Sequence, residues 1–108
     1  MTVPNASATM RKGVVHMKQR FEPGLVAATP GALEVLKNDL DLASMLITRH
    51  ICGDFGDIDA EDAGLNVEAI RLGRARIMSV YKLFGAGTVW IITEGDRSST
   101  TILIPAEY

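Results

Sequence analysis

The chain has 108 residues, of which 47% are hydrophobic and 22% are charged, and its formal net charge is −2. This is ordinary globular composition at the usual size of one domain, so we expect one small core. No run of about 18 apolar residues and no apolar secretory signal is present, which predicts a cytoplasmic protein that does not enter membranes. The single cysteine, Cys52, excludes an internal disulfide and lacks partners at zinc-ligand spacing, so we expect neither a metal nor a cofactor.

The charge is unevenly distributed along the chain. Residues 1–21 carry +4, while the remaining 7 basic and 13 acidic residues give −6. We interpret residues 1–20 as a flexible basic arm and residues 21–108 as a single folded domain. The arm can contact nucleic-acid phosphates, but four charges without interleaved aromatic residues are a weak signal, and a frayed terminus is the simpler interpretation.

The folded part opens with signals for a strand and a helix. Residues 25–28 are apolar and bounded by Pro-Gly and Thr-Pro, which is typical of an edge strand. Thr29 can cap a helix that has Pro30 at its first position, because the hydroxyl accepts from a free backbone N–H and proline needs none. This pattern predicts a helix over 30–37.

A second helix follows a polar interruption. Asn38 and Asp39 are poor in a helix interior, so we expect Asp41 to cap a separate helix over residues 42–51. Its helical spacing predicts an inward face formed by Leu42, Met45 and Leu46.

A third helix and a sheet complete the predicted fold. Asn66 can cap a helix over 67–72, which Gly73 would end in a left-handed conformation. The period then changes to two in three β-rich runs separated by glycine turns, at residues 76–83, 88–94 and 99–104.

These elements predict an α+β domain in which about three short helices pack on a three-stranded antiparallel meander, with residues 25–28 as a possible edge strand. Both sheet faces carry apolar residues, so we expect the helices to cover one face and the N-terminal segment or a partner to cover part of the other. The core candidates are Leu33, Leu36, Leu46, Ile70, Ile77, Val89, Ile91, Ile102 and Ile104.

The first concentration of chemistry surrounds residues 49–62. His50 lies near the expected C-terminal end of the second helix, where the helix dipole and Asp54 favour a protonated imidazole. It is a candidate general base, although a capping or surface histidine is the commoner arrangement. Cys52 follows at a spacing that does not bring the two side chains together, so we interpret it as a small buried hydrophobe.

The acidic part of this segment partly matches a calcium loop. Asp57, Asp59, Glu61 and Glu68 occupy its positions 1, 3, 5 and 12, but position 6 is Asp62 where the loop needs glycine. A solvated turn in which Asp57 or Asp59 caps a helical turn fits the residues better.

The second concentration is the predicted hairpin over residues 93–101. Arg97 can clamp a phosphate or carboxylate, with nearby hydroxyl groups as donors. The structural alternative is a tight Gly-Asp turn in which Arg97 pairs with Glu94 or Asp96, and we favour it.

We expect the two polar segments to meet in one groove at a sheet end, because the loop between the second and third helices must stay close to the sheet. Asp54 or Asp57 would then contact Arg97. The alternative is a loop that projects into solvent at the opposite end. The predicted binding set is His50, Asp54, Asp57, Glu94, Asp96, Arg97 and Ser98.

Four segments carry a family resemblance: TPGAL at 29–33, HICGDFGD at 50–57, WIITEGDRSSTT at 90–101 and PAEY at 105–108. From about residue 21 onward the chain resembles small bacterial proteins encoded on plasmids, integrative elements and prophages. The resemblance implies mobile-element origin and a cytoplasmic location, and it carries over no activity. The helix-then-sheet order is also similar in topology to small ribonucleases of the RelE, barnase and colicin type.

Two functions follow as hypotheses. The one we favour is a non-enzymatic module that binds another protein as an adaptor, inhibitor or regulator, with homo-oligomerisation left open. The alternative is a metal-independent ribonuclease in which His50 transfers a proton, Arg97 stabilises the phosphorane, and Thr100 or Tyr81 positions the phosphate. The charge of −6 outside the arm argues against RNA binding, since neutralised phosphates supply much of its affinity.

Overall fold

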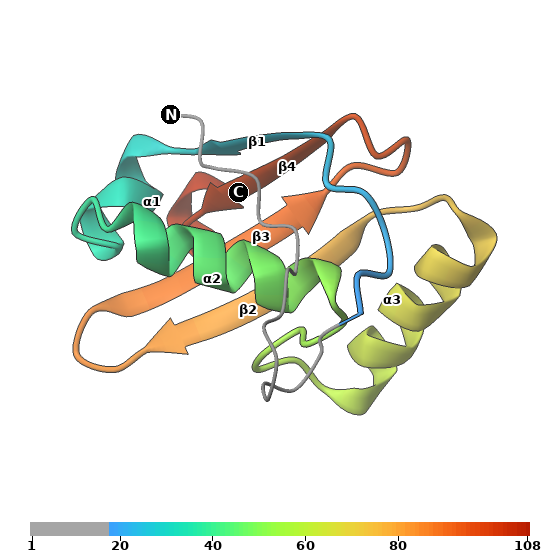
Figure 1. The fold of residues 1–108 in the computed structure, drawn as a ribbon. Helices are drawn as coiled ribbons and strands as arrows, with labels where there is room; N and C mark the ends of the chain where they lie inside the picture. Colours follow the sequence, from blue (N-terminus) through green and yellow to red (C-terminus); the bar gives the residue numbers. More distant parts are fainter. Residues whose placement is uncertain (1–17) are drawn as a thin grey trace, which may run out of the picture.

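The computed structural model describes residues 18–108 (Figure 1). The elements follow in the order β1 (Leu25–Ala28), α1 (Pro30–Val35), α2 (Leu40–Ile51), α3 (Ala60–Leu72), β2 (Ile77–Leu83), β3 (Gly87–Thr93), β4 (Ser99–Leu103) and the short 3₁₀ turn η1 (Pro105–Glu107). Most of the predicted basic arm lies outside the described residues. Of its last three residues, Arg20 donates its backbone N–H to the carbonyl of Ile51 at 2.8 Å.

The sheet has four strands in the order β1-β4-β3-β2. The predicted antiparallel meander is present, since β3 pairs antiparallel with both β2 and β4. The predicted edge strand is also present, but β1 pairs with β4 in parallel, so the sheet is mixed and not purely antiparallel. Parallel neighbours need a long crossover, and here all three helices and two strands lie between β1 and β4.

The core lies between one face of this sheet and the helices, with α2 lying across that face (Figure 1). Alternate strand residues point toward α2, which buries its own Ala43, Leu46, Ile47 and Ile51 against them. Six predicted core residues are buried: Leu36, Leu46, Ile77, Val89, Ile91 and Ile102. The other three, Leu33, Ile70 and Ile104, are half-buried at its border.

The opposite sheet face is partly covered by the C-terminal residues. Ile92 and Leu103 are buried there, and Trp90 is half-buried. The Trp90 ring meets Tyr108 edge-on, with 5.4 Å between the ring centroids. Glu107 anchors this segment by accepting from the Thr29 hydroxyl at 2.6 Å. The chain's own C-terminal residues therefore take part of the role that we assigned to the N-terminal segment or a partner.

The first two helices begin close to where the sequence predicts. Thr29 caps α1 as expected, accepting from the N–H of Ala32 at 3.1 Å. The cap of α2 is Asp39 and not Asp41, because the Asp39 carboxylate accepts from the N–H of Leu42. Met45 was expected to point inward and is 51% exposed.

The third helix differs most from its prediction. It begins at Ala60 instead of residue 67, and Asp59 caps it by accepting from the N–H of Asp62 at 2.8 Å. This confirms the helix-capping interpretation of the acidic segment, because a calcium loop over residues 57–68 cannot also be helical. Gly73 ends the helix with a φ of +70°, as predicted.

Candidate functional site

A chain of hydrogen bonds centred on His50 runs through the core. His50 Nδ1 lies 2.6 Å from Ser79 Oγ on β2, and Nε2 lies 2.8 Å from Thr93 Oγ1 on β3. Thr93 Oγ1 lies 2.6 Å from Thr100 Oγ1 on β4, whose hydroxyl donates to the carbonyl of Pro23 at 2.7 Å. The chain therefore connects α2 with three strands and with the segment that precedes β1.

The terminal carbonyl fixes the direction of the three bonds that lead from it to His50 Nε2. Pro23 can only accept, so Thr100 spends its one hydroxyl proton there and must accept from Thr93. Thr93 then has no proton left for His50, so Nε2 carries the proton and donates it. With the ring neutral, as its burial favours, His50 is therefore the Nε2–H tautomer, and its Nδ1 accepts from the Ser79 hydroxyl.

Burial agrees with this assignment. The His50 side chain is fully buried, and burial lowers its pKa to about 3 because the charged imidazolium loses its hydration. The ring of Phe21 also closes on it edge-on at 5.2 Å between centroids. The general-base role assigned to His50 needs access to a substrate, and in this structure both of its ring nitrogens are occupied inside the core.

The Arg97 guanidinium is held by main-chain carbonyls. It donates to the carbonyl of Ala69 at the end of α3, at 2.9 Å, and to that of Ala75 before β2, at 2.6 Å. It also donates to the carbonyls of Glu94 and Gly95 in its own turn. We predicted pairing with a carboxylate of Glu94 or Asp96, and the contacts are instead to main-chain oxygens. The turn itself requires a positive φ of 61° at Arg97.

Asp54 has a partner that the sequence prediction missed. Its carboxylate receives two hydrogen bonds from Arg49, at 2.7 and 3.2 Å, and these hold the pKa of Asp54 below its usual value. The Asp54 carbonyl accepts from the buried Tyr81 hydroxyl at 2.6 Å, and burial raises the pKa of that phenol. The predicted contact between Asp54 and Arg97 is not formed.

The remaining predicted binding residues are spread over separate contacts. Glu94 pairs with Arg76 at 3.3 Å, and the Asp96 carboxylate accepts from the N–H of Ser98 at 2.9 Å. Of the residues proposed for a ribonuclease, the structure joins His50 to Thr100 through Thr93, but inside the core. The Phe21 ring contacts both residues: it meets His50 edge-on, and the Arg97 Cζ lies 5.8 Å from its centroid.

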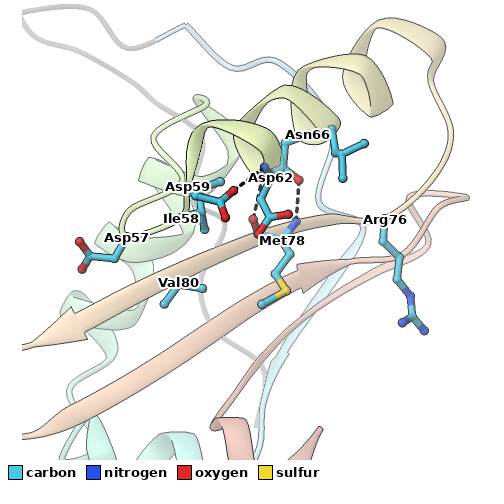
Figure 2. Close-up of a pocket in the computed structure, with 9 residues that line it drawn as sticks. Asp57, Ile58, Asp59, Asp62, Asn66, Arg76, Met78 and Val80 are labelled. Carbon is cyan, nitrogen blue, oxygen red and sulfur yellow. Dashed lines mark hydrogen bonds between the residues drawn. The ribbon is translucent and has the colours of Figure 1, made fainter.

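A groove of about 400 Å³ lies elsewhere, between α3 and the outer edge of β2 (Figure 2). Apolar side chains from the loop before α3, from α3 and from β2 form its floor: Ile58, Leu65, Met78 and Val80. Carboxylates line the end nearest the start of α3: Asp57, Asp59 and Asp62. Only Asp57 belongs to the predicted binding set.

The β2 edge beneath this groove is closed by contacts from α3 and the loop before it. The Asn66 side-chain amide donates to the Met78 carbonyl at 2.8 Å and accepts from the Met78 N–H at 3.1 Å. The backbone of Val80 is paired in the same way by the loop before α3: its N–H donates to the Phe55 carbonyl, and its carbonyl accepts from the Asp57 N–H. Asn66, predicted as a cap, acts here as a substitute for a neighbouring strand.

A smaller hollow of about 240 Å³ lies on the sheet face that points away from the core, the face that also carries Met78 and Val80, and it is lined in part by Ile92, Leu103 and Tyr108. Arg76 borders both hollows. The Arg76 Nη1 donates to the Tyr108 hydroxyl at 3.1 Å, so within the smaller hollow this N–H group already has an acceptor.

Metal-ligand geometry, helix length and the single thiol complete the description of residues 18–108. In this range no three His, Cys, Asp or Glu side chains are arranged to hold a metal ion. No helix of the described part has the length and apolar character needed to cross a membrane. The half-buried Cys52 thiol has a raised pKa because of partial desolvation. Comparisons with protein-family models, curated proteins and solved structures found no match to this chain.

Proposed function

We propose that this protein is a non-enzymatic module that binds another protein through the groove between α3 and β2. The observation that carries the proposal is the groove itself, an exposed apolar floor next to three carboxylates. Its volume falls at the small end of the range of roughly 300–1,000 Å³ that is usual for binding pockets. Leu65 on its floor is 64% exposed, so its side chain is accessible to a partner.

The positions of the titratable side chains also support a binding role. A general base must reach the proton that it removes, and His50 is enclosed by the core. The Arg97 guanidinium donates to four main-chain carbonyls, so it has little donor capacity left for the phosphate that the ribonuclease hypothesis assigns to it. An accessory role on a mobile element remains part of the proposal and rests on the sequence resemblance alone.

The proposal is tested by capture of partners from a bacterial lysate with the full chain, followed by mass spectrometry. The test variant is Leu65→Ser, and its control is Val67→Ser, an equally simple change at an exposed residue of α3 that does not line the groove. We expect the wild type and Val67→Ser to retain the same partner and Leu65→Ser to lose it. Equal recovery by all three would contradict the proposal.

The enzymatic alternative has its own test. The purified chain is incubated with RNA in EDTA, and the same assay is run with His50→Ala after its melting temperature has been measured. We expect no cleavage by the wild type. Cleavage that a folded His50→Ala variant lacks would replace the binding proposal with the ribonuclease hypothesis.

A further inference from the structure

We infer that the groove between α3 and β2 recognises a segment of a partner protein in which lysine or arginine side chains stand next to apolar ones. This inference rests on the proposed function and adds the chemistry of the partner. An acidic segment and a nucleic acid are the alternatives that the test must separate from it.

Helix α3 exposes large apolar side chains beside the groove. Of the eight large hydrophobic residues exposed within residues 18–108, three lie on this one helix: Leu65 and Leu72, and Val67, which lies about 200° around the helix from Leu65 and does not line the groove. Leu65 and Leu72 are seven residues apart and therefore lie on the same side of the helix, two turns from each other. Leu65 lines the groove, and Leu72 adds a second exposed apolar side chain two turns further along α3. A partner that contacts this line must supply apolar side chains of its own.

The end of the groove nearest the start of α3 carries three carboxylates. Within residues 18–108, no ion pair involves Asp57, Asp59 or Asp62. The one cationic side chain that borders the groove, Arg76, points away from these carboxylates in Figure 2 and pairs with Glu94. The three carboxylates therefore present negative charge that no ion pair of the described residues neutralises: Arg49 interacts with Asp57 only at longer range, and Arg76 borders the groove but pairs with Glu94.

A lysine or arginine side chain can contact both the apolar floor and the acidic end of the groove. Its aliphatic stem can lie on apolar surface such as Met78 and Val80, while its charged end reaches the carboxylates at the start of α3. A phosphate backbone or an acidic peptide would meet like charge there, in addition to the −6 of residues 22–108. Charge complementarity thus favours a basic segment over both alternatives.

The experiment measures the binding of three fluorescently labelled peptides of equal length by anisotropy. One peptide alternates lysine with leucine, one alternates glutamate with leucine, and one alternates lysine with glutamine. We expect measurable binding of the lysine–leucine peptide, weakening with added salt, and at least about tenfold weaker binding of the other two. A single-stranded RNA of similar length serves as the fourth probe and should not bind.

Matched variants locate the site. Asp62→Lys should weaken the lysine–leucine peptide about tenfold. Its control, Asp41→Lys, reverses an exposed aspartate in the first turn of α2, which has the same relation to a helix dipole but does not line the groove. In the same way, Leu65→Ser should weaken binding and Val67→Ser should not.

The outcomes also separate this inference from the proposed function. Equal effects of Asp62→Lys and Asp41→Lys, or preferential binding of the glutamate peptide or the RNA, would overturn the inference. If a captured partner requires Leu65 but binds Asp62→Lys as well as the wild type, the binding function stands and the basic segment is wrong. If no partner requires Leu65, the binding function itself fails, whatever the peptides show.

Discussion

Thr93 accepts a hydrogen bond from His50 Nε2 and donates one to Thr100, so two strands and a helix share one hydroxyl group inside the core. Burial favours the neutral imidazole in this arrangement, because no water hydrates a charged ring there. A protonated ring would turn its Nδ1 into a second donor and remove the acceptor that Ser79 uses. The network therefore makes His50 a structural residue whose ionisation opposes folding.

The first prediction is that stability falls as the pH drops from about 6.5 toward 3. The pKa of His50 is about 3 in the folded protein and near 6.5 when unfolded, so between these values the unfolded chain binds a proton that the folded chain does not. The contribution is complete above the unfolded pKa and is lost as the pH falls through this window. Urea titrations between about pH 5 and 7 should show the free energy of unfolding decreasing by up to roughly 1 kcal/mol per pH unit at the acidic end.

Two variants isolate the source of this slope. His50→Gln cannot titrate, so it should be less stable at neutral pH and show a flatter profile. His16→Gln removes the other histidine and leaves His50 in place, so its slope should match the wild type. A wild-type slope that survives His50→Gln would assign the effect to another group.

The second prediction concerns the tautomer. Nitrogen-15 NMR of the imidazole at neutral pH should show a protonated Nε2 and an unprotonated Nδ1, because the donor direction is set by the Pro23 carbonyl. In Thr100→Val, Thr93 no longer has a hydroxyl to donate to, so its own hydroxyl is free to donate to His50 Nε2 and either tautomer can form, although the ring stays neutral. Observation of the Nδ1–H form in the wild type would show that the chain of donors runs the other way.

The third prediction compares two glycines with nearly equal positive φ angles, +72° at Gly56 and +70° at Gly73. A Cβ on Gly56 would lie 2.0 Å from the Val80 carbonyl oxygen, whereas one on Gly73 would meet no atom within 4 Å. Gly73→Ala should therefore cost only the backbone strain of about 1 kcal/mol, and Gly56→Ala should cost roughly 2 kcal/mol more. Equal losses in urea denaturation would mean that the loop before α3 moves away from β2 without penalty.

The fourth prediction is that Arg97→Lys is not a conservative change. A lysine ammonium cannot reach the carbonyls of Ala69 and Ala75 in the forked geometry of a guanidinium, so at least one of these bonds is lost. We expect a loss of roughly 2 kcal/mol in the free energy of unfolding. Arg74→Lys, at an exposed position in the same connection, should change it by less than about 0.5 kcal/mol. Similar stability of the two variants would mean that Arg97 does not hold this connection.

Local chemistry made much of the fold predictable. Thr29 and Gly73 mark helix ends through interactions with their own neighbours in sequence, and the structure has both. The direction of β1 was not predictable in this way, because it depends on a pairing with β4 across more than half of the chain. The start of α3 was misplaced because Asn66 looks like a cap and instead bonds to Met78, a contact that local propensity does not encode.

The site was harder to predict, for a related reason. His50 was identified as a notable residue, but its two hydrogen-bond partners come from two different strands. One signal was present in the sequence: Ser79 and Thr93 are hydroxyl residues on strand faces that are otherwise apolar, and such residues need a polar partner in the core. The groove was missed because its apolar floor is assembled from single residues of separate elements, and only its acidic end forms a pattern in the sequence.

The Asn66 amide has a consequence for the behaviour of the protein at high concentration. An outer strand with free N–H and C=O groups is a template onto which another molecule can add its own strand, and this is a common route to aggregation. At Met78 that template is already filled by a side chain that mimics a peptide group. At this place the groove exposes apolar side chains, while the N–H and C=O groups of Met78 are already hydrogen-bonded and cannot pair with an added strand.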